Sequence, residues 1–392
     1  MKYIAESYNK FTVKYHGASP SVASFYYICG GQTVKEQIYL PASADGTFTS
    51  YTENFLDGEL AYGLFDLRLD VRGEGGAEID DITVEAAKVP GGGTYFIEND
   101  ILKVGVELVW GGGLSYYEDK RCTVDGLHNM LNHADTGRLV QQSYYGTGEP
   151  PYMKGEFMGN PWVYNPVQGG DRGNRKSKLI DFAVTENSVW VKCRPREWGH
   201  VGLYTYSYME NTYTIDGGVL KVDNKFTDWS GYTHPKNGQE VPAFYTVSYL
   251  DNFYFYNGDE PWQNKPLEVR RDLIFWPEDW PRHRFPLNEK NTETWCAWCD
   301  INDYGIGLYV PGVKLYVAGR FSHNGTKDPA ASPTNYVAPI YDLQLVSYKP
   351  LGYSYIVTSG KLNEIREEFR KRKDFTDNAS FTDYNKQRTI LL

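Results

Sequence analysis

The chain has 392 residues, of which 41% are hydrophobic and 23% charged, so it is long enough for two packed domains and its composition excludes a largely disordered protein. It carries 40 basic and 50 acidic residues, a net charge of -10, and this balance argues against nucleic acid or an anionic membrane surface as partners. Aromatic residues make up 16% of the chain, which favours the pleated, half-buried surfaces of β-strands.

The first 90 residues predict a small β-sandwich. Polar and apolar residues alternate over 11–17, 33–40 and 79–85, as they do in half-buried strands, and the glycines at 91–93 predict a turn that ends this unit. The segment Ile79–Glu85, IDDITVE, resembles the last strand of the jelly-roll modules that bind carbohydrate in polysaccharide-degrading enzymes. The resemblance implies a carbohydrate-binding module over 1–90. The alternative is a rigid spacer that binds no ligand.

Residues 94–392 predict a larger antiparallel sandwich. Alternating runs at 188–193, 203–215, 219–228 and 307–321 are separated by turn residues, and helical periodicity is confined to 362–370. The segments 95–106 and 110–119 have the form ENDxLxVxV…GGxLSYxxD, which resembles the start of galactose-mutarotase-like β-supersandwich domains. We therefore expect an all-β fold: an N-terminal jelly-roll β-sandwich, and a large antiparallel β-supersandwich with a short C-terminal helix as the catalytic domain.

Two polar stretches, 132–146 and 160–171, predict a ligand-facing surface, because polar groups buried without partners cost about 1–3 kcal/mol each. The mutarotase-like resemblance implies that His133 and the Gly137-Arg138 pair face the sugar. Alternatively, Arg138 forms a structural ion pair with Asp135. The candidate catalytic residues of these stretches are His133, Asp135 and Asp171, and the candidate substrate-binding residues are Arg138, Gln142, Tyr145, Trp162, Tyr164, Asn165 and Gln168.

Further candidates come from later strands. Glu240 lies between a loop of Pro, Asn and Gly and an apolar strand, where burial by aromatic neighbours would raise its pKa and suit it to general acid catalysis. The alternative is an exposed loop glutamate. Further possible sugar contacts are Trp295, Trp298, His323 and Tyr336. Because side chains alternate along a strand, at most one of the two tryptophans would line a cleft unless a bulge intervenes.

Three functions fit these residues, all with an oligosaccharide or polysaccharide as the partner. A glycoside hydrolase would use Glu240 with Asp135 or Asp171 as its carboxyl pair. A polysaccharide lyase would use His133 or Tyr145 as the base and Arg138 to neutralise a uronate. The third is a sugar epimerase or a non-catalytic sugar-binding protein. We rank the hydrolase first.

The sequence predicts no cofactor and no metal. Cys296 and Cys299 form a CxxC, but no second cysteine pair completes a zinc site, and no phosphate-binding loop is present. Five cysteines at irregular spacing and a first segment without an apolar core predict a cytoplasmic protein with free thiols, although a secreted chain without its signal peptide would look the same. Exposed aromatics and edge strands are compatible with a homo-oligomer.

Overall fold

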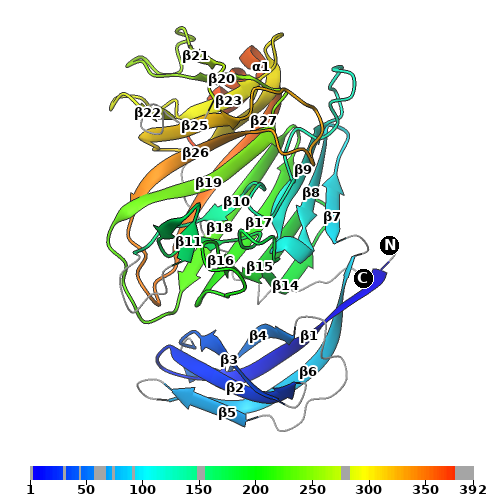
Figure 1. Cartoon of the computed structure of the whole chain (residues 1–392), viewed down its shortest axis with the longest axis vertical. Helices are drawn as coiled ribbons and strands as arrows, with labels where there is room; N and C mark the ends of the chain where they lie inside the picture. Colours follow the sequence, from blue (N-terminus) through cyan, green and yellow to red (C-terminus); the bar gives the residue numbers. More distant parts are fainter. Residues whose placement is uncertain are drawn as a thin grey trace.

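The computed structural model describes residues 3–29, 32–43, 46–56, 68–72, 76–90, 93–147, 155–274 and 283–375. Nearly all regular structure in these ranges is β-strand, and the named strands pair in antiparallel fashion. The expected all-β class is therefore confirmed (Figure 1). In the part of the chain that is described, no helix has the length and apolarity needed to cross a membrane.

The N-terminal strands form two three-stranded sheets, ordered β4-β1-β6 and β3-β2-β5. Alternate residues of β1, among them Phe11 and Val13, face Ala23 and Phe25 of β2 and are almost completely buried. The predicted strand at 79–85 lies within β6, while residues 91 and 92 of the predicted turn lie outside the described ranges. The strands are β1 (Tyr3–His16), β2 (Ser21–Cys29), β3 (Gln32–Leu40), β4 (Thr49–Leu56), β5 (Arg68–Arg72) and β6 (Glu78–Pro90).

The remaining strands build a large sandwich from a nine-stranded sheet, ordered β14-β15-β17-β18-β27-β24-β23-β20-β21, and a seven-stranded sheet, ordered β16-β13-β10-β19-β26-β25-β22. A three-stranded sheet, β7-β8-β9, and the hairpin β11-β12 accompany them. One continuous apolar core collects residues from both large sheets. Sheet-on-sheet packing of this kind buries the inner faces of both sheets.

The bounds of these elements are β7 (Thr94–Glu98), β8 (Leu102–Glu107), η2 (Leu108–Trp110), β9 (Gly113–Asp119), β10 (Gln141–Ser143), β11 (Gly155–Phe157), β12 (Asn160–Trp162), β13 (Pro166–Val167), β14 (Lys178–Val184), β15 (Ser188–Arg194), β16 (Arg196–Glu197), β17 (Ser207–Asp216), β18 (Val219–Asp228), β19 (Asn237–Val247), β20 (Asn252–Phe255), β21 (Glu268–Arg271), β22 (Arg284–Pro286), β23 (Trp295–Cys299), β24 (Tyr304–Tyr309), β25 (Leu315–Phe321), β26 (Thr334–Leu343), β27 (Leu351–Lys361) and α1 (Leu362–Lys371).

The N-terminal sandwich packs against the outer face of β14, β15 and β17. Tyr208 and Trp229 belong to the same apolar cluster as the N-terminal core. Buried charges join the two parts as well: the Arg194 guanidinium donates to the Glu36 carboxylate at 3.1 Å, and the Lys10 ammonium lies 3.3 Å from Asp181. Figure 1 shows β1 to β6 directly below β14 and β15. Apolar contacts and buried ion pairs therefore both contribute to this interface.

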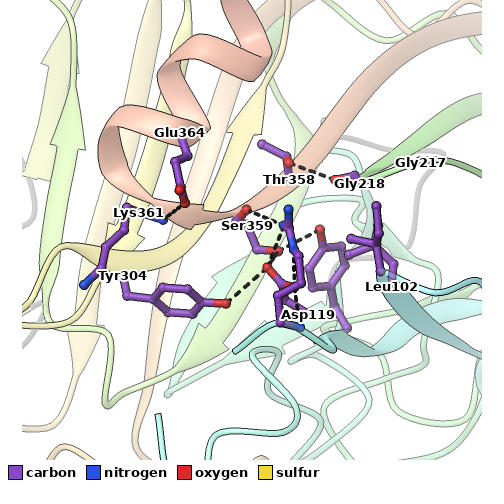
Figure 2. Close-up of polar contacts among 12 residues, drawn as sticks. Leu102, Asp119, Gly217, Gly218, Tyr304, Thr358, Ser359, Lys361 and Glu364 are labelled. Atoms are coloured by element: carbon purple, nitrogen blue, oxygen red, sulfur yellow. Dashed lines mark hydrogen bonds and ion pairs between the residues drawn. The ribbon is translucent and has the colours of Figure 1, made fainter. Parts of the chain in front are cut away.

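The glycine-rich segment 95–119, which opens the large sandwich, is joined to other strands by hydrogen bonds at its end. Asp119, its last residue, is buried and accepts hydrogen bonds from Arg121 at 2.8 Å, Ser359 at 2.9 Å and Tyr304 at 3.1 Å, which ties β9 to β24 and β27 (Figure 2). Burial alone would raise the pKa of Asp119, but the bonds from Arg121 and Ser359 outweigh it and lower the pKa. Asn99, at the other end of the segment, accepts the backbone N–H groups of residues 101 and 102.

The predicted C-terminal helix is present as α1, and its apolar face covers β23 and β24. Ile365 and Phe369 are fully buried, and the Phe369 ring lies 5.8 Å from that of Trp295. Trp298 points the other way, into the core between the sheets. Both tryptophans are at most 1% exposed, so neither is the sugar contact that was predicted. The side chains of β23 alternate between its two faces as predicted, but both faces of this strand are covered.

Candidate functional site

A carboxyl group held by two phenols lies on the face of the seven-stranded sheet that is turned away from the main core. The Tyr145 hydroxyl donates to Oε1 of Glu240 at 2.9 Å, and the Tyr336 hydroxyl donates to the same oxygen. Glu240 lies on β19, Tyr336 on the neighbouring β26, and Tyr145 just after β10 on the other side of β19. We call Glu240, Tyr145 and Tyr336 the carboxyl–phenol cluster.

Strand register places these side chains together. Glu240 pairs with Ser143 of β10 and with Ile340 of β26, so all three project from the same face. Five residues of β19, from Glu240 to Phe244, oppose four on β26, from Ile340 to Val337, which is a β-bulge next to the carboxyl. Bulges redirect side chains and are common beside binding sites. Tyr245, further along β19, packs its ring 4.9 Å from that of Tyr336.

The surroundings keep the Glu240 carboxyl protonated to higher pH than usual. Burial raises its pKa, and hydrogen bonds from Tyr336, Tyr145 and Ser143 oppose this shift without cancelling it. The side chain is nevertheless partly exposed. Burial and the neighbouring Glu240 raise the pKa of Tyr145 far above its ordinary value, so this phenol remains a donor. Both phenols bind the same oxygen, Oε1.

An ion pair borders this cluster. The Arg138 Nε lies 3.3 Å from the Asp135 carboxylate, and a further guanidinium nitrogen donates to the Ser332 carbonyl at 2.5 Å. Burial raises the pKa of the Tyr245 phenol, the charges of Glu240 and Asp135 raise it further, and the charge of Arg138 lowers it. The alternative that Arg138 and Asp135 pair with each other is therefore confirmed. Each side chain keeps 26% to 35% of its surface exposed, so a ligand can still reach the pair.

Aromatic rings continue the same surface beyond Tyr145. The Trp162 ring lies edge-on to Tyr145 at 6.4 Å and 5.1 Å from Phe157, which in turn lies 6.0 Å from Trp198. The Trp162 indole N–H donates to the Asn165 side chain at 3.1 Å, and this bond fixes the ring. Partly exposed rings that lie together in this way provide the apolar contact that a pyranose face needs.

Asn165 is itself anchored by a buried glutamate. Both Glu197 oxygens accept the backbone N–H of Asn165, at 2.9 and 3.0 Å. The Asn165 amide donates to the Ser143 hydroxyl at 3.3 Å and the Tyr144 carbonyl at 2.8 Å. Burial raises the pKa of Glu197 to about 8, although the backbone N–H groups lower it. Asn165 was predicted to bind substrate, and the structure instead shows it positioning Trp162 and Ser143.

Several predicted site residues lie elsewhere. Asp171 is fully buried and accepts the backbone N–H groups of residues 173, 175 and 202, so it organises a loop and is no catalytic partner for Glu240. Gln142 and Gln168 are buried in the core, where both donate to Asn211. These three predictions were wrong: Asp171 is engaged by its own loop, and the two glutamines find their partner on β17, distant in the sequence.

Three more candidates are separate from the carboxyl–phenol cluster. Tyr164 is buried, stacks on the His234 ring at 4.7 Å and donates to Asp228. His323 is solvent-exposed beyond the end of β25. His133 places Nδ1 3.1 Å from the Ser115 carbonyl and lines a hollow on a different sheet. The residues that sequence analysis missed are Ser143, Phe157, Glu197, Trp198 and Tyr245; the aromatic alternation around 245 was the signal available for Tyr245.

The described residues contain no group of three His, Cys, Asp or Glu side chains arranged to hold a metal ion. Cys296 and Cys299 are buried, and burial raises the pKa of both thiols. Neither thiol is therefore suited to act as a thiolate ligand or nucleophile.

The chain is similar to several solved structures. They include a galactose mutarotase related enzyme from Lactobacillus acidophilus (13% identity, TM-score 0.42, 68% of this chain and 97% of that one) and a galactose mutarotase-like protein from Lactobacillus casei (14%, 0.39, 68% and 100%). A 4-alpha-glucanotransferase from Thermococcus litoralis is similar at 10% identity, with a TM-score of 0.31 over 69% of this chain and 37% of that one. No protein-family model and no curated protein sequence matches the chain.

Proposed function

We propose that the protein is a carbohydrate-active enzyme in which Glu240 transfers a proton at the anomeric centre of a sugar, as an aldose epimerase does. The observation that carries this proposal is the carboxyl–phenol cluster: a partly exposed carboxyl whose pKa is raised by burial and whose Oε1 is held by Tyr145 and Tyr336. A base works best when its pKa lies near the working pH, and a raised pKa brings Glu240 closer to neutrality.

In this reaction the ionised Glu240 takes the proton of the anomeric hydroxyl while the ring C–O bond opens. The ring oxygen receives a proton from water. When the ring closes on the other face of the carbonyl, the ring oxygen gives this proton back to water and Glu240 returns its proton to the new anomeric hydroxyl, which gives the other anomer. Arg138 is the donor of this surface that can bind the ring oxygen or neighbouring hydroxyls, because the single proton of Tyr145 is already donated to Glu240. Trp162 offers an apolar face for the sugar ring.

Glycosidic cleavage is the second candidate, and one observation favours it. Asp135 and Glu240 both act on the Tyr245 phenol, so two carboxyl groups border the same surface. In that case Glu240 would be the general acid and Asp135 the second carboxyl. Asp135 is however paired with Arg138, and the other predicted partner, Asp171, is buried in a loop.

A lyase is the least supported of the predicted functions. A tyrosine can act as the base of an elimination only when its phenol is ionised. The pKa of Tyr145 is raised far above its ordinary value, so this phenol stays protonated. The other predicted base, His133, lines a hollow whose lining residues do not include Glu240 or Arg138.

Three assays on the same preparation separate these functions. Exchange between α and β anomers is followed by NMR for free glucose, galactose and mannose, release of reducing ends is followed for neutral oligosaccharides, and ultraviolet absorbance is followed for polyuronates. We expect faster anomer exchange without release of new reducing ends. Release of reducing ends without faster exchange would replace the epimerase proposal with hydrolysis, and a rise in absorbance would replace it with elimination.

A further inference from the structure

A hollow lies on the three-stranded sheet β7-β8-β9, and its lining does not include the carboxyl–phenol cluster. It has a volume of about 210 Å³ and is lined by Thr94, Phe96, Glu107, Trp110, Ser115, Tyr116 and His133. None of these residues belongs to the carboxyl–phenol cluster or to the aromatic surface that contains Trp162. The hollow therefore needs an explanation of its own.

Three aromatic side chains supply its apolar surface. The rings of Phe96 and Tyr116 meet edge to face at 5.4 Å, and Phe96 is 43% exposed. Trp110 is partly exposed at the end of η2. Gly105 makes this arrangement possible, because a Cβ at that position would lie 2.8 Å from both the Phe96 ring and the Tyr116 side chain. An exposed aromatic corner over a hollow is costly in water unless something covers it.

Polar groups line the rest of the hollow. The Thr94 hydroxyl donates to the Glu107 carboxylate at 2.6 Å. His133 Nδ1 lies 3.1 Å from the Ser115 carbonyl, which can only accept, so Nδ1 carries the proton and Nε2 of the neutral ring is an acceptor. A carboxylate and an imidazole nitrogen both accept hydrogen bonds, and hydroxyl groups of a ligand can donate to them.

The charges near the hollow favour a neutral ligand. The Lys103 ammonium lies 4.8 Å from the Phe96 ring centre and the Lys176 ammonium 5.4 Å from that of Trp110, while Glu107 contributes the opposite charge. Charges of both signs leave no strong field for an anion or a cation. The volume is below the ~300–1,000 Å³ of sites for drug-sized ligands, which suits a single ring and excludes a long chain segment inside the hollow.

We propose that this hollow is an accessory binding site for one neutral pyranose ring, which stacks on the corner of Phe96 and Tyr116 and donates hydroxyl protons to Glu107 and His133. The site lies on a separate sheet from Glu240, so the inference does not require Glu240 to be catalytic. His133, predicted from sequence as a catalytic residue, would then contact sugar here without taking part in the reaction.

Proton–nitrogen correlation NMR of the full chain tests the proposal, with the Trp110 indole signal as reporter. The signal is assigned with a Trp110→Phe variant. Methyl α-glucopyranoside, methyl α-mannopyranoside and methyl β-galactopyranoside are the probes, because a methyl glycoside cannot change its anomeric form and turnover does not disturb the titration. We expect a saturable shift of the Trp110 signal with at least one probe.

Two variants locate the binding. Phe96→Ala should weaken the interaction about fivefold to tenfold, the size of one aromatic contact. Phe48→Ala is the matched control, since Phe48 is 45% exposed and also lies beside a lysine, Lys14, but lines no part of this hollow. Glu240→Gln should leave the titration unchanged.

Three results would overturn the proposal: no shift of the Trp110 signal with any probe, an equal affinity in Phe96→Ala and the wild type, or loss of the shift in Glu240→Gln. Failure of the proposed reaction is distinguishable from failure of this proposal. If the wild-type protein is inactive but still shows the Trp110 titration, only the proposed reaction is contradicted.

Discussion

The Tyr145 hydroxyl and the Glu240 carboxylate, 95 residues apart in the chain, meet at 2.9 Å across neighbouring strands. The bond exists because β10 pairs with β19 in a register that sets Ser143 opposite Glu240, two residues before Tyr145. It orients the carboxyl and partly offsets the effect of burial on its pKa. The chemistry of Glu240 thus depends on a strand pairing as much as on the residue itself.

Tyr145→Phe should move the acidic limb of the pH–activity profile upward. The lost bond stabilises ionised Glu240, so without it the pKa rises further and the base form is reached at higher pH, by up to about one pH unit. The pH dependence of kcat measures this shift. Tyr245→Phe is the control, since Tyr245 lies on the same face and has no described hydrogen bond to Glu240. An identical limb in wild type and Tyr145→Phe would contradict the prediction.

Glu197→Gln should make folding stability less dependent on pH. The pKa of Glu197 is raised from 4.5 to about 8 in the folded protein, so between these values the folded state binds more protons than the unfolded state. Its contribution is present below pH 4.5 and is lost as the pH rises towards 8, at a slope of at most about 1.4 kcal/mol per pH unit. Urea unfolding across this window checks it, and parallel stability curves for the two proteins would rule it out.

Glu293→Ala should strongly destabilise the protein and release α1. Glu293 is fully buried, binds Arg366 of the helix through both oxygens at 2.6 and 3.1 Å, and accepts the Trp295 indole N–H. Its removal leaves the Arg366 charge buried without its carboxylate, at a cost of about 3–5 kcal/mol. Glu367→Ala, which breaks an exposed pair with Arg370 on the same helix, should change little. Equal unfolding midpoints for the two variants would show that the buried pair does not hold the helix.

Arg194→Ala should loosen the N-terminal sandwich from the large one. The guanidinium is almost fully buried and donates to Glu36 and to the carbonyl of residue 37 in the N-terminal part, at 3.1 Å each. We expect faster hydrogen exchange in β1 to β4 and a loss of about 3–5 kcal/mol. Lys14→Ala is the control, because the Lys14–Asp80 pair is exposed. Unchanged exchange in the Arg194 variant would argue that the apolar contacts at Tyr208 and Trp229 suffice.

Much of the fold could be predicted from alternation and turns, because burial of one strand face imposes a period of two on the sequence. The strand at 79–85 and the helix near Ile365 and Phe369 are examples. The functional residues were harder to predict. Gln142 and Gln168 look ligand-facing in sequence, yet Asn211 satisfies both inside the core, and no local pattern reveals a partner some 40 to 70 residues away.

Glu240 and Tyr336 were each predicted as site residues, but their contact depends on the register of β19 with β26 and on the bulge that follows Glu240. Asp171 failed for the opposite reason: an aspartate in a Gly-rich loop commonly binds backbone N–H groups, and this local role left it unavailable for catalysis. The roles of the carboxyl groups in this chain are therefore set by their three-dimensional surroundings, which the sequence does not display.

The rate of anomer exchange in Glu240→Gln, compared with Asp135→Asn, tests the central claim most directly. Glutamine keeps the shape of the side chain and a carbonyl oxygen for the two phenols but cannot accept the hydroxyl proton, so exchange should fall by about 10²-fold or more while the melting temperature stays the same. Asp135→Asn should retain exchange within about tenfold, because Asp135 pairs with Arg138 and accepts the Gly137 backbone N–H, and asparagine keeps an oxygen for both contacts. A folded Glu240→Gln protein with wild-type exchange would contradict the account.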